Sequence, residues 1–271
     1  MAARPITFLS DYGYVDEFAG VCRAVIARIA PDALVIDLTH GIERHAIDRG
    51  AEVLANAMPY TPAGVHLAVV DPGVGSPRRA LAVRVATEDR MLVGPDNGLL
   101  WPAIEQLGGA VEAVDVSLSR FRLEPISATF HGRDVFAPVA AHLARGASLD
   151  DAGEPVDADA LFRLEAPEPV IEADRVLAHV VSLDGFGNAT LDLSERHLPE
   201  TGLRLGRKLT IEAGGAIRDA VFTLTFADVP DGELILYENS YGSLAVALNR
   251  GDAAGDLGLD PGTQVTLRPA D

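Results

Sequence analysis

Five short polar clusters contain the side chains that could carry chemistry in this chain. Asp, Asn, Gly and Pro are common turn formers, so any one of these clusters alone would be explained as a turn. Together they also place His and Arg beside carboxylates, which ordinary turns do not require. Carboxylates and imidazoles bind polar ligands and transfer protons. The clusters are Ser10-Asp11, Asp37-Leu38-Thr39-His40, Asp71-Pro72-Gly73-Val74-Gly75, Pro95-Asp96-Asn97-Gly98 and Thr129-Phe130-His131-Gly132-Arg133-Asp134.

The elements that must position these clusters alternate between strand and helix. Apolar runs predict strands at residues 6–9, 34–38, 65–70, 81–85 and 91–93. Apolar residues at helical spacing predict helices at 18–29, 47–57 and 135–143. This alternation predicts an α/β domain with a mainly parallel sheet flanked by helices. Ligands of such sheets bind outside the carboxyl ends of the strands, which is where four of the clusters fall.

The pattern changes near residue 150. Residues 150–174 are rich in Asp, Glu, Ala and Pro, which is typical of a linker or surface crossing. Beyond them, short β-type runs recur between Gly- and Asp-bearing turns, which predicts a small all-β domain, either a sandwich or a barrel. We therefore expect an N-terminal α/β domain at 1–165 and a C-terminal β domain at 172–271, with the linker at about 150–175.

Composition narrows the classes of partner and location. The chain has 22 Lys+Arg against 40 Asp+Glu, a formal charge of −18. That balance argues against binding nucleic acid or anionic membranes and favours a cationic partner. The single cysteine, Cys22, excludes an intrachain disulfide framework and a cysteine-based zinc cluster. With no apolar run near the roughly 20 residues of a membrane span and a start too short and polar for a signal peptide, we expect a cytoplasmic protein.

Several familiar cofactor and catalytic signatures are absent from the sequence. It contains no Gly-x4-Gly-Lys-Ser/Thr loop, no His-Glu-x-x-His and no Gly-x-Ser-x-Gly. Gly73-Val74-Gly75 is followed by Arg78 where a dinucleotide-binding fingerprint needs glycine, which disfavours NAD binding there. These absences argue against those particular kinds of site.

Seven motifs in order give the chain a resemblance to a known family. They are Ser10-Asp11-Tyr12-Gly13, Asp37-Leu38-Thr39-His40, Val69-Val70-Asp71-Pro72-Gly73-Val74-Gly75, Gly94-Pro95-Asp96-Asn97-Gly98, Thr129-Phe130-His131-Gly132-Arg133-Asp134, Asp184-Gly185-Phe186-Gly187-Asn188 and Asn239-Ser240-Tyr241-Gly242. The chain resembles the S-adenosyl-L-methionine (SAM) hydroxide adenosyltransferases, also called adenosine-forming SAM hydrolases, which are relatives of the SAM-dependent fluorinase and chlorinase. Each motif alone is weak, but the ordered set runs from about Ile6 to about Leu248.

The resemblance implies both an architecture and a reaction. It implies an N-terminal α/β domain, a C-terminal β-barrel and a homotrimer whose active sites lie between the N-terminal domain of one subunit and the C-terminal domain of its neighbour. The implied reaction is hydrolysis of SAM to adenosine and L-methionine by attack of an activated water on ribose C5′. SAM is then the substrate, and we expect no metal and no organic cofactor.

The resemblance also implies a catalytic set of Asp71, Arg78 and His131. Methionine leaves as a neutral thioether, so the enzyme's task is to position the water and remove its proton. Asp71 would accept a hydrogen bond from the water, His131 would take the proton or orient the water, and Arg78 would hold the carboxylate in place. Asp71 and His131 both stay open as the formal base. Arg79 is adjacent, but the family spacing favours Arg78.

The remaining implied residues bind the polar ends of the substrate or its adenine. Asp11 would accept hydrogen bonds from the ribose hydroxyls. The methionine amino group would be received by Asp16, Asp184 and Ser240.

Adenine would sit against Phe186 and Phe226, with Asn188 pairing its polar edge. Asn239 and Tyr241 complete the implied substrate-binding set.

Two alternative functions stay open beside hydrolysis. One is a SAM-dependent halogenase, although the fluorinase has tyrosine where Asp71 stands and arginine where Tyr241 stands. A carboxylate at that position would repel a halide but orient a water. The other is a SAM- or adenosine-binding module without catalysis.

Overall fold

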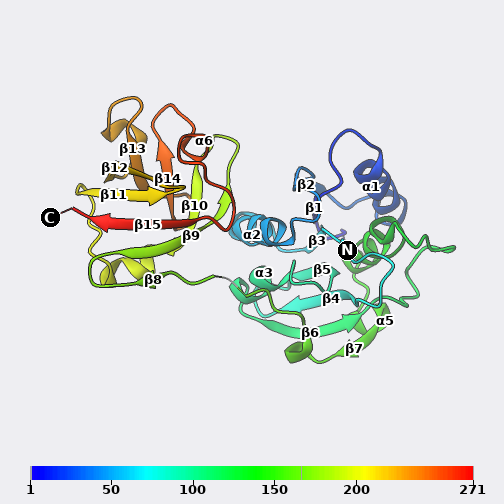
Figure 1. The fold of residues 1–271 in the computed structure, drawn as a ribbon. Helices are drawn as coiled ribbons and strands as arrows, with labels where there is room; N and C mark the ends of the chain where they lie inside the picture. Colours follow the sequence, from blue (N-terminus) through cyan, green and yellow to red (C-terminus); the bar gives the residue numbers. More distant parts are fainter. Residues whose placement is uncertain (1, 166, 271) are drawn as a thin grey trace. The chain divides into compact units, whose positions relative to one another are not determined.

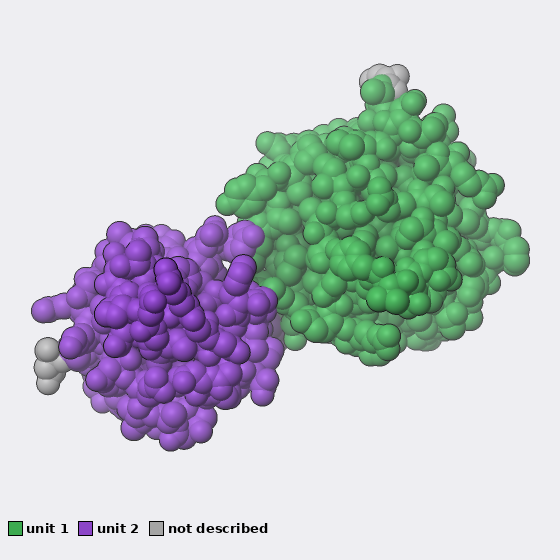
Figure 2. Space-filling view, turned by 90° about the horizontal axis from the view of Figure 1, so that it is seen from above, with its two compact units in different colours: residues 1–164 green, residues 165–271 purple. Residues whose placement is uncertain are grey.

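The computed structural model describes residues 2–165 and 167–270. The chain divides into two compact units, residues 1–164 and 165–271 (Figures 1 and 2). The first unit contains helices and one sheet, whereas the second is built almost entirely of strands. In the described ranges, no helix is both long enough and apolar enough to cross a membrane.

The sheet of the first unit has the strand order β2-β1-β3-β5-β4-β6-β7. The first four of these strands in that order are mutually parallel, and β4, β6 and β7 extend the sheet by antiparallel pairings. This confirms the predicted α/β domain with a mainly parallel sheet. The strands are β1 (Ile6–Ser10), β2 (Val35–Thr39), β3 (Val65–Val69), β4 (Ala80–Val85), β5 (Met91–Pro95), β6 (Ala110–Asp115) and β7 (Glu154–Val156).

Helices cover both faces of this sheet. In β1, Ile6 and Phe8 pack with α1 (Phe18–Ile29) and α4 (Ala137–Ala144) on one face. Leu9 points to the other face, where it packs in the cluster formed with α2 (Ile47–Ala57) and α3 (Trp101–Gln106). Because both faces are covered, a central strand such as β3 is buried at every position, as its nearly continuous apolar sequence predicts.

Residues 149–164, most of which fall in the segment expected to be a linker, contribute to the first unit. They form the short helix α5 (Leu149–Ala152), β7 and the 3-10 turn η3 (Ala158–Ala160). Pro155 stands opposite Val114 of β6. β7 is the last strand of the sheet, and an edge strand tolerates proline because one of its sides needs no ladder donor.

The second unit is a closed β-barrel. Its strands follow the order β10-β14-β13-β12-β11-β15-β9, and a further pairing of β9 with β10 closes the ring. Of the two folds that the sequence left open for this domain, a sandwich and a barrel, the structure is therefore a barrel. The elements are β8 (Val170–Ile171), β9 (Val176–Leu183), β10 (Ala189–Ser194), η4 (Glu195–Glu200), β11 (Lys208–Ala213), β12 (Ala216–Phe222), η5 (Phe226–Asp228), β13 (Leu234–Glu238), β14 (Ser243–Leu248), α6 (Ala253–Leu257) and β15 (Gln264–Pro269).

Alternating burial along the strands fills the barrel interior. In β9, Val176, Ala178 and Val180 are buried and join one apolar cluster, while the residues between them are more exposed. β10 repeats the pattern with Leu191 and Leu193. A period of two is what a strand with one buried face requires.

Candidate functional site

Asp71, Arg78 and His131 meet at the carboxyl end of the parallel strands. Arg78 Nε donates to Asp71 Oδ1 at 2.9 Å, and its Nη2 donates to Asp71 Oδ2. The same Nη2 lies 3.0 Å from Nδ1 of His131. Only 6% of the Asp71 side chain and 10% of the Arg78 side chain are exposed, so the ion pair is largely removed from water.

The loop from Asp71 to Arg78 is shaped by local turns and one close approach. The Val74 N–H donates to the Asp71 carbonyl, and Asn97 Nδ2 donates to the Val70 carbonyl at 2.9 Å. Gly75 has a φ of +78°, and a Cβ there would lie 2.6 Å from the Ala128 carbonyl oxygen. A residue without a side chain is therefore needed where this loop meets the segment that leads to His131.

The π-helical turn η2 (Gly132–Phe136) directly follows His131. Asp134 in this turn is 1% exposed. Its carboxylate accepts hydrogen bonds from the Arg133 side chain and from the Ser127 N–H at 2.8 Å. The loop before His131 is therefore tied to the turn after it. Single π-turns are frequent at functional sites.

The protonation state of His131 follows from its neighbour. Burial and then the positive charge of Arg78 lower the pKa of His131 below its ordinary value, although Asp71 and Asp134 oppose the shift. A guanidinium has donors only, so Nδ1 of His131 must be the acceptor of its contact with Arg78. Neutral His131 therefore carries its proton on Nε2, where it can donate a hydrogen bond but cannot accept one.

Tyr12 and Phe136 belong to the surroundings of this cluster, although the sequence pattern assigned neither a role. Burial raises the pKa of Tyr12 well above its ordinary value, with Cys22, Asp11 and Asp71 adding to the effect. The Tyr12 phenol therefore stays protonated. The Phe136 ring lies 5.2 Å from the Arg78 guanidinium carbon, within cation–π range. The only sequence signal for Tyr12 was its place in the motif Ser10-Asp11-Tyr12-Gly13.

Asp11 lies on the same edge of the sheet as Asp71. Ser10 is level with Val69 in the pairing of β1 with β3, and the Asp11 N–H donates to the Val69 carbonyl at 3.4 Å. Oδ2 of Asp11 accepts from the His45 N–H at 3.1 Å. No hydrogen bond from residues 2–165 or 167–270 reaches the other oxygen, Oδ1, which is therefore available to a ligand at this edge.

Asp16 is placed in a different surrounding from Asp71. It is exposed and lines a hollow of about 260 Å³ together with Asp37 and His40.

Arg79, the neighbour of Arg78, pairs with Asp96 at 2.6 Å and not with Asp71. The contact with Asp71 is thus made by Arg78, the arginine that the family spacing indicated.

In the second unit, Asp184 organises the turn between β9 and β10. Its Oδ1 accepts from the N–H groups of Phe186 and Asn188, and its Oδ2 accepts from Asn188 Nδ2 at 2.7 Å. Asn188 is buried, whereas 82% of Phe186 is exposed. The turn therefore exposes the Phe186 ring to solvent and holds the side-chain amide of Asn188 in place.

The other four predicted residues of this unit lie in two short segments, η5 and the β13–β14 hairpin. The Phe226 ring packs 5.0 Å from that of Tyr237, centroid to centroid. In the hairpin, Asn239 Oδ1 accepts from the Tyr241 N–H at 2.9 Å, and both Ser240 and Tyr241 are exposed. Asn239 thus sets the turn that holds these two side chains outward.

The described parts of the chain contain no group of three or more His, Cys, Asp or Glu side chains arranged to hold a metal ion.

The comparison with known proteins covers both units. Residues 6–153 match the SAM hydroxide adenosyltransferase N-terminal domain, and residues 178–266 match the corresponding C-terminal domain. A protein of Salinispora tropica named (R)-S-adenosyl-L-methionine hydrolase is 48% identical over 268 residues, covering 98% of this chain and 99% of that protein. A fluorinase of Nocardia brasiliensis is 28% identical, covering 98% of this chain and 97% of that protein.

Among solved structures, an uncharacterized conserved protein from Thermotoga maritima superposes with a TM-score of 0.90. It is 34% identical, and the match covers 97% of this chain and 99% of that one.

A Gly132→Ala substitution tests the packing that supports His131. A Cβ at Gly132 would lie 1.9 Å from the Tyr12 hydroxyl oxygen, so either Tyr12 or the η2 turn must move. We expect a loss of about 1–3 kcal/mol in the free energy of unfolding, measured by urea denaturation. The cost should shrink in a Tyr12→Phe background, where the hydroxyl is gone.

The matched control is Gly20→Ala in α1, where a Cβ meets nothing within 4 Å. That helical position should be stabilised by up to about 1 kcal/mol. Equal stability of Gly132→Ala and the parent protein would show that the contact between Tyr12 and Gly132 is not as described.

Proposed function

The chain belongs to the SAM hydroxide adenosyltransferase family, and from that premise we propose that it hydrolyses SAM to adenosine and L-methionine. The contact among Asp71, Arg78 and His131 carries the proposal, because it brings a carboxylate and a neutral imidazole together at the carboxyl end of the parallel strands. The family match covers both units, and the name of the Salinispora relative specifies the same substrate.

Hydrolysis of SAM requires little catalysis beyond the activation of a water molecule. The sulfonium makes methionine a good leaving group, because the departing thioether is neutral and needs no proton. Water must approach C5′ in line with the C–S bond and lose a proton as the C–O bond forms. The products are then adenosine, methionine and one proton. A reaction of this kind needs no metal and no organic cofactor, so we propose that none takes part.

We assign the proton transfer to Asp71 and the orientation of the water to His131. The Nδ1 lone pair of His131 is committed to Arg78, so its free Nε2–H can only donate to the water oxygen. Asp71 also receives two hydrogen bonds from Arg78, but a carboxylate has about four lone-pair sites and keeps acceptor capacity. We therefore propose Asp71, and not His131, as the base.

The charges around the site suit a sulfonium with a protonated amine. Asp11 keeps one carboxylate oxygen for the ribose hydroxyls, and Asp16 is exposed for the amino group. Asp184 and Ser240 would complete the amine site. Phe186, Phe226 and Asn188 would enclose the adenine end, as the resemblance implies. Asn239 and Tyr241 would complete the substrate-binding set.

A halide nucleophile fits this site less well than water. In the proposed mechanism the nucleophile approaches beside the carboxylate of Asp71, and two negative charges at contact distance repel each other. The pairing with Arg78 leaves that carboxylate in place to orient a neutral water.

We further propose that the enzyme is a homotrimer with its sites between subunits. The predicted site residues fall on both units, five on the first and seven on the second, which suits a site completed by neighbouring chains. The cytoplasmic location stays a prediction of the sequence.

Replacing Asp71 by Asn tests the assignment of the base. Asparagine keeps the shape but cannot accept the proton, so adenosine formation from SAM should fall by about 10²- to 10⁴-fold. His131→Gln retains an N–H donor near Nε2 and should lose only about tenfold. Chromatography of the products measures both rates, and circular dichroism checks that each variant is folded.

Arg79→Lys is the matched control, because Arg79 pairs with Asp96 outside the cluster, and its rate should stay within about twofold of the parent. A larger loss in His131→Gln than in Asp71→Asn would make His131 the base. A near-normal rate in Asp71→Asn would remove the mechanism altogether.

Mixing two inactive chains tests the shared site. We expect Asp71→Asn and Asp184→Ala chains to be inactive when each is produced alone. Co-produced chains, purified through two different tags, should regain part of the activity, because some sites then combine the intact unit of each chain. Mixed assemblies as inactive as the separate variants would contradict a site built from two subunits.

A further inference from the structure

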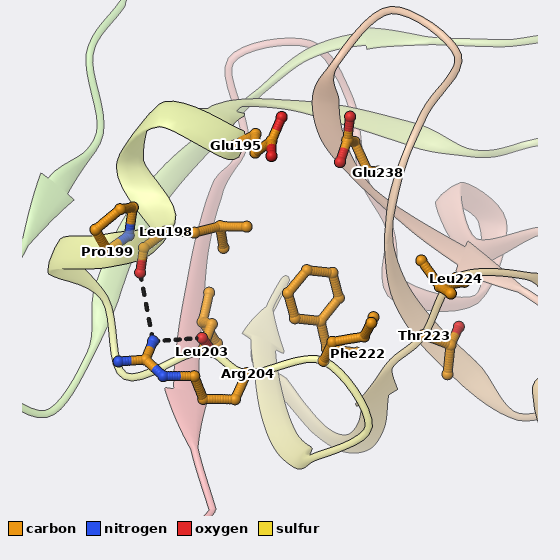
Figure 3. Close-up of a pocket in the computed structure, with 10 residues that line it drawn as sticks. Glu195, Leu198, Pro199, Leu203, Arg204, Phe222, Thr223, Leu224 and Glu238 are labelled. Carbon is orange, nitrogen blue, oxygen red and sulfur yellow. Dashed lines mark hydrogen bonds between the residues drawn. The ribbon is translucent and has the colours of Figure 1, made fainter.

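The barrel unit contains a pocket that none of the predicted SAM-binding residues lines. Its volume is about 590 Å³, within the range of roughly 300–1,000 Å³ that small-molecule sites occupy. Figure 3 shows its walls, which come from η4, the segment after it, the end of β12 and the end of β13. The lining residues are Glu195, Leu198, Pro199, Leu203, Arg204, Leu205, Phe222, Thr223, Leu224 and Glu238.

Most of the wall is apolar and part of it is open to water. Phe222 and Leu203 are buried, with 6% and 3% exposure, and belong to the barrel core. By contrast, Leu224 is 71% exposed and Leu205 is 52% exposed. A ligand with an apolar body would cover these two leucines and gain from the surface removed from water.

The polar groups of the pocket are separated by charge. Glu195 and Glu238 lie at the same end of it in Figure 3. Neither carboxylate forms an ion pair or a side-chain hydrogen bond within residues 2–165 and 167–270. This end of the pocket therefore carries two negative charges that no described residue compensates.

Arg204 is the one basic side chain among the described residues that line the pocket, and it hydrogen-bonds to backbone carbonyls. Its Nη1 donates to the carbonyls of Thr201 at 2.8 Å and Leu203 at 2.7 Å, and more weakly to Leu198 at 3.4 Å. Figure 3 shows the guanidinium at the end away from the two glutamates. The Arg204 guanidinium therefore stabilises the segment after η4 and does not pair with either glutamate. Both carboxylates can then bind a cation.

We propose that this pocket binds a small organic cation, an ammonium or guanidinium group on an apolar body. The cationic group would lie between Glu195 and Glu238, and the body would lie on Phe222, Leu198 and Leu224. The complementarity of charge selects the cation, and the apolar wall selects its attachment to a hydrocarbon or aromatic group. The site is independent of the proposed reaction, since SAM hydrolysis assigns no role to any of these residues.

Isothermal titration calorimetry of the full chain with phenylbutylamine tests the proposal. Phenylbutanol and phenylbutyrate serve as the neutral and anionic counterparts of the same body. The amine should bind roughly fivefold or more tightly than the alcohol, and the carboxylate should bind most weakly. Leucine-methyl NMR should locate the binding at Leu198, Leu203 and Leu224.

Two variants separate the roles of charge and apolar wall. Glu195→Gln combined with Glu238→Gln should abolish the preference for the amine while keeping the weak affinity for the alcohol. Leu224→Ser, at an exposed rim position that the fold does not need, should weaken both ligands alike. Glu233→Gln is the control, because Glu233 precedes β13 at the end of the strand opposite to Glu238 and is exposed.

Absence of binding by the amine, or equal binding of the amine and the anion, would overturn the proposal. A double variant that retains the preference for the amine would do the same. If a second copy of the chain covers the pocket, Leu224→Ser will lower the mass of the assembly and the amine will not bind, which also overturns it. Adenosine formation is measured separately, so failure here leaves the proposed hydrolysis untouched.

Discussion

The ion pair between Arg78 and Asp71 is the interaction on which the first unit's site depends. Both side chains are nearly buried, and removing one partner of such a pair costs about 3–5 kcal/mol, because the other charge is left without compensation. The pair also underlies the proposed assignment of the base. Since Arg78 donates to Nδ1 of His131, the imidazole is a donor at Nε2, and the carboxylate of Asp71 is the acceptor that we propose for the proton.

The fold brings these residues together through strand ends and two close backbone approaches. Parallel pairing of β1 with β3 puts Asp11 and Asp71 at one edge of the sheet. Gly75 lets the loop carrying Arg78 approach Ala128, and Gly132 makes room for the hydroxyl of Tyr12 in the turn that follows His131. Each glycine is required for the space it leaves, because a Cβ at either position would overlap an oxygen atom.

Local sequence patterns predicted the elements whose structure is set by the spacing of their own apolar residues. The apolar run of β3 and the helical spacing of α1 were visible in the sequence. Asp71 and His131, which stand in two of the polar clusters, both contact Arg78 in the structure. β10 was not predicted, because its residues Ala189 to Ser194 have few β-branched side chains and become a strand only by closing the barrel between β9 and β14. The role of Tyr12 depends on a contact 120 residues away along the chain, with Gly132, which no local pattern contains.

Hydrolysis of SAM in ¹⁸O-labelled water, followed by mass spectrometry of both products, tests the central claim most directly. If water held by Asp71 and His131 attacks ribose C5′, the label must enter adenosine at its 5′-hydroxyl, while methionine stays unlabelled. Formation of unlabelled adenosine, or of no adenosine at all, would contradict the account.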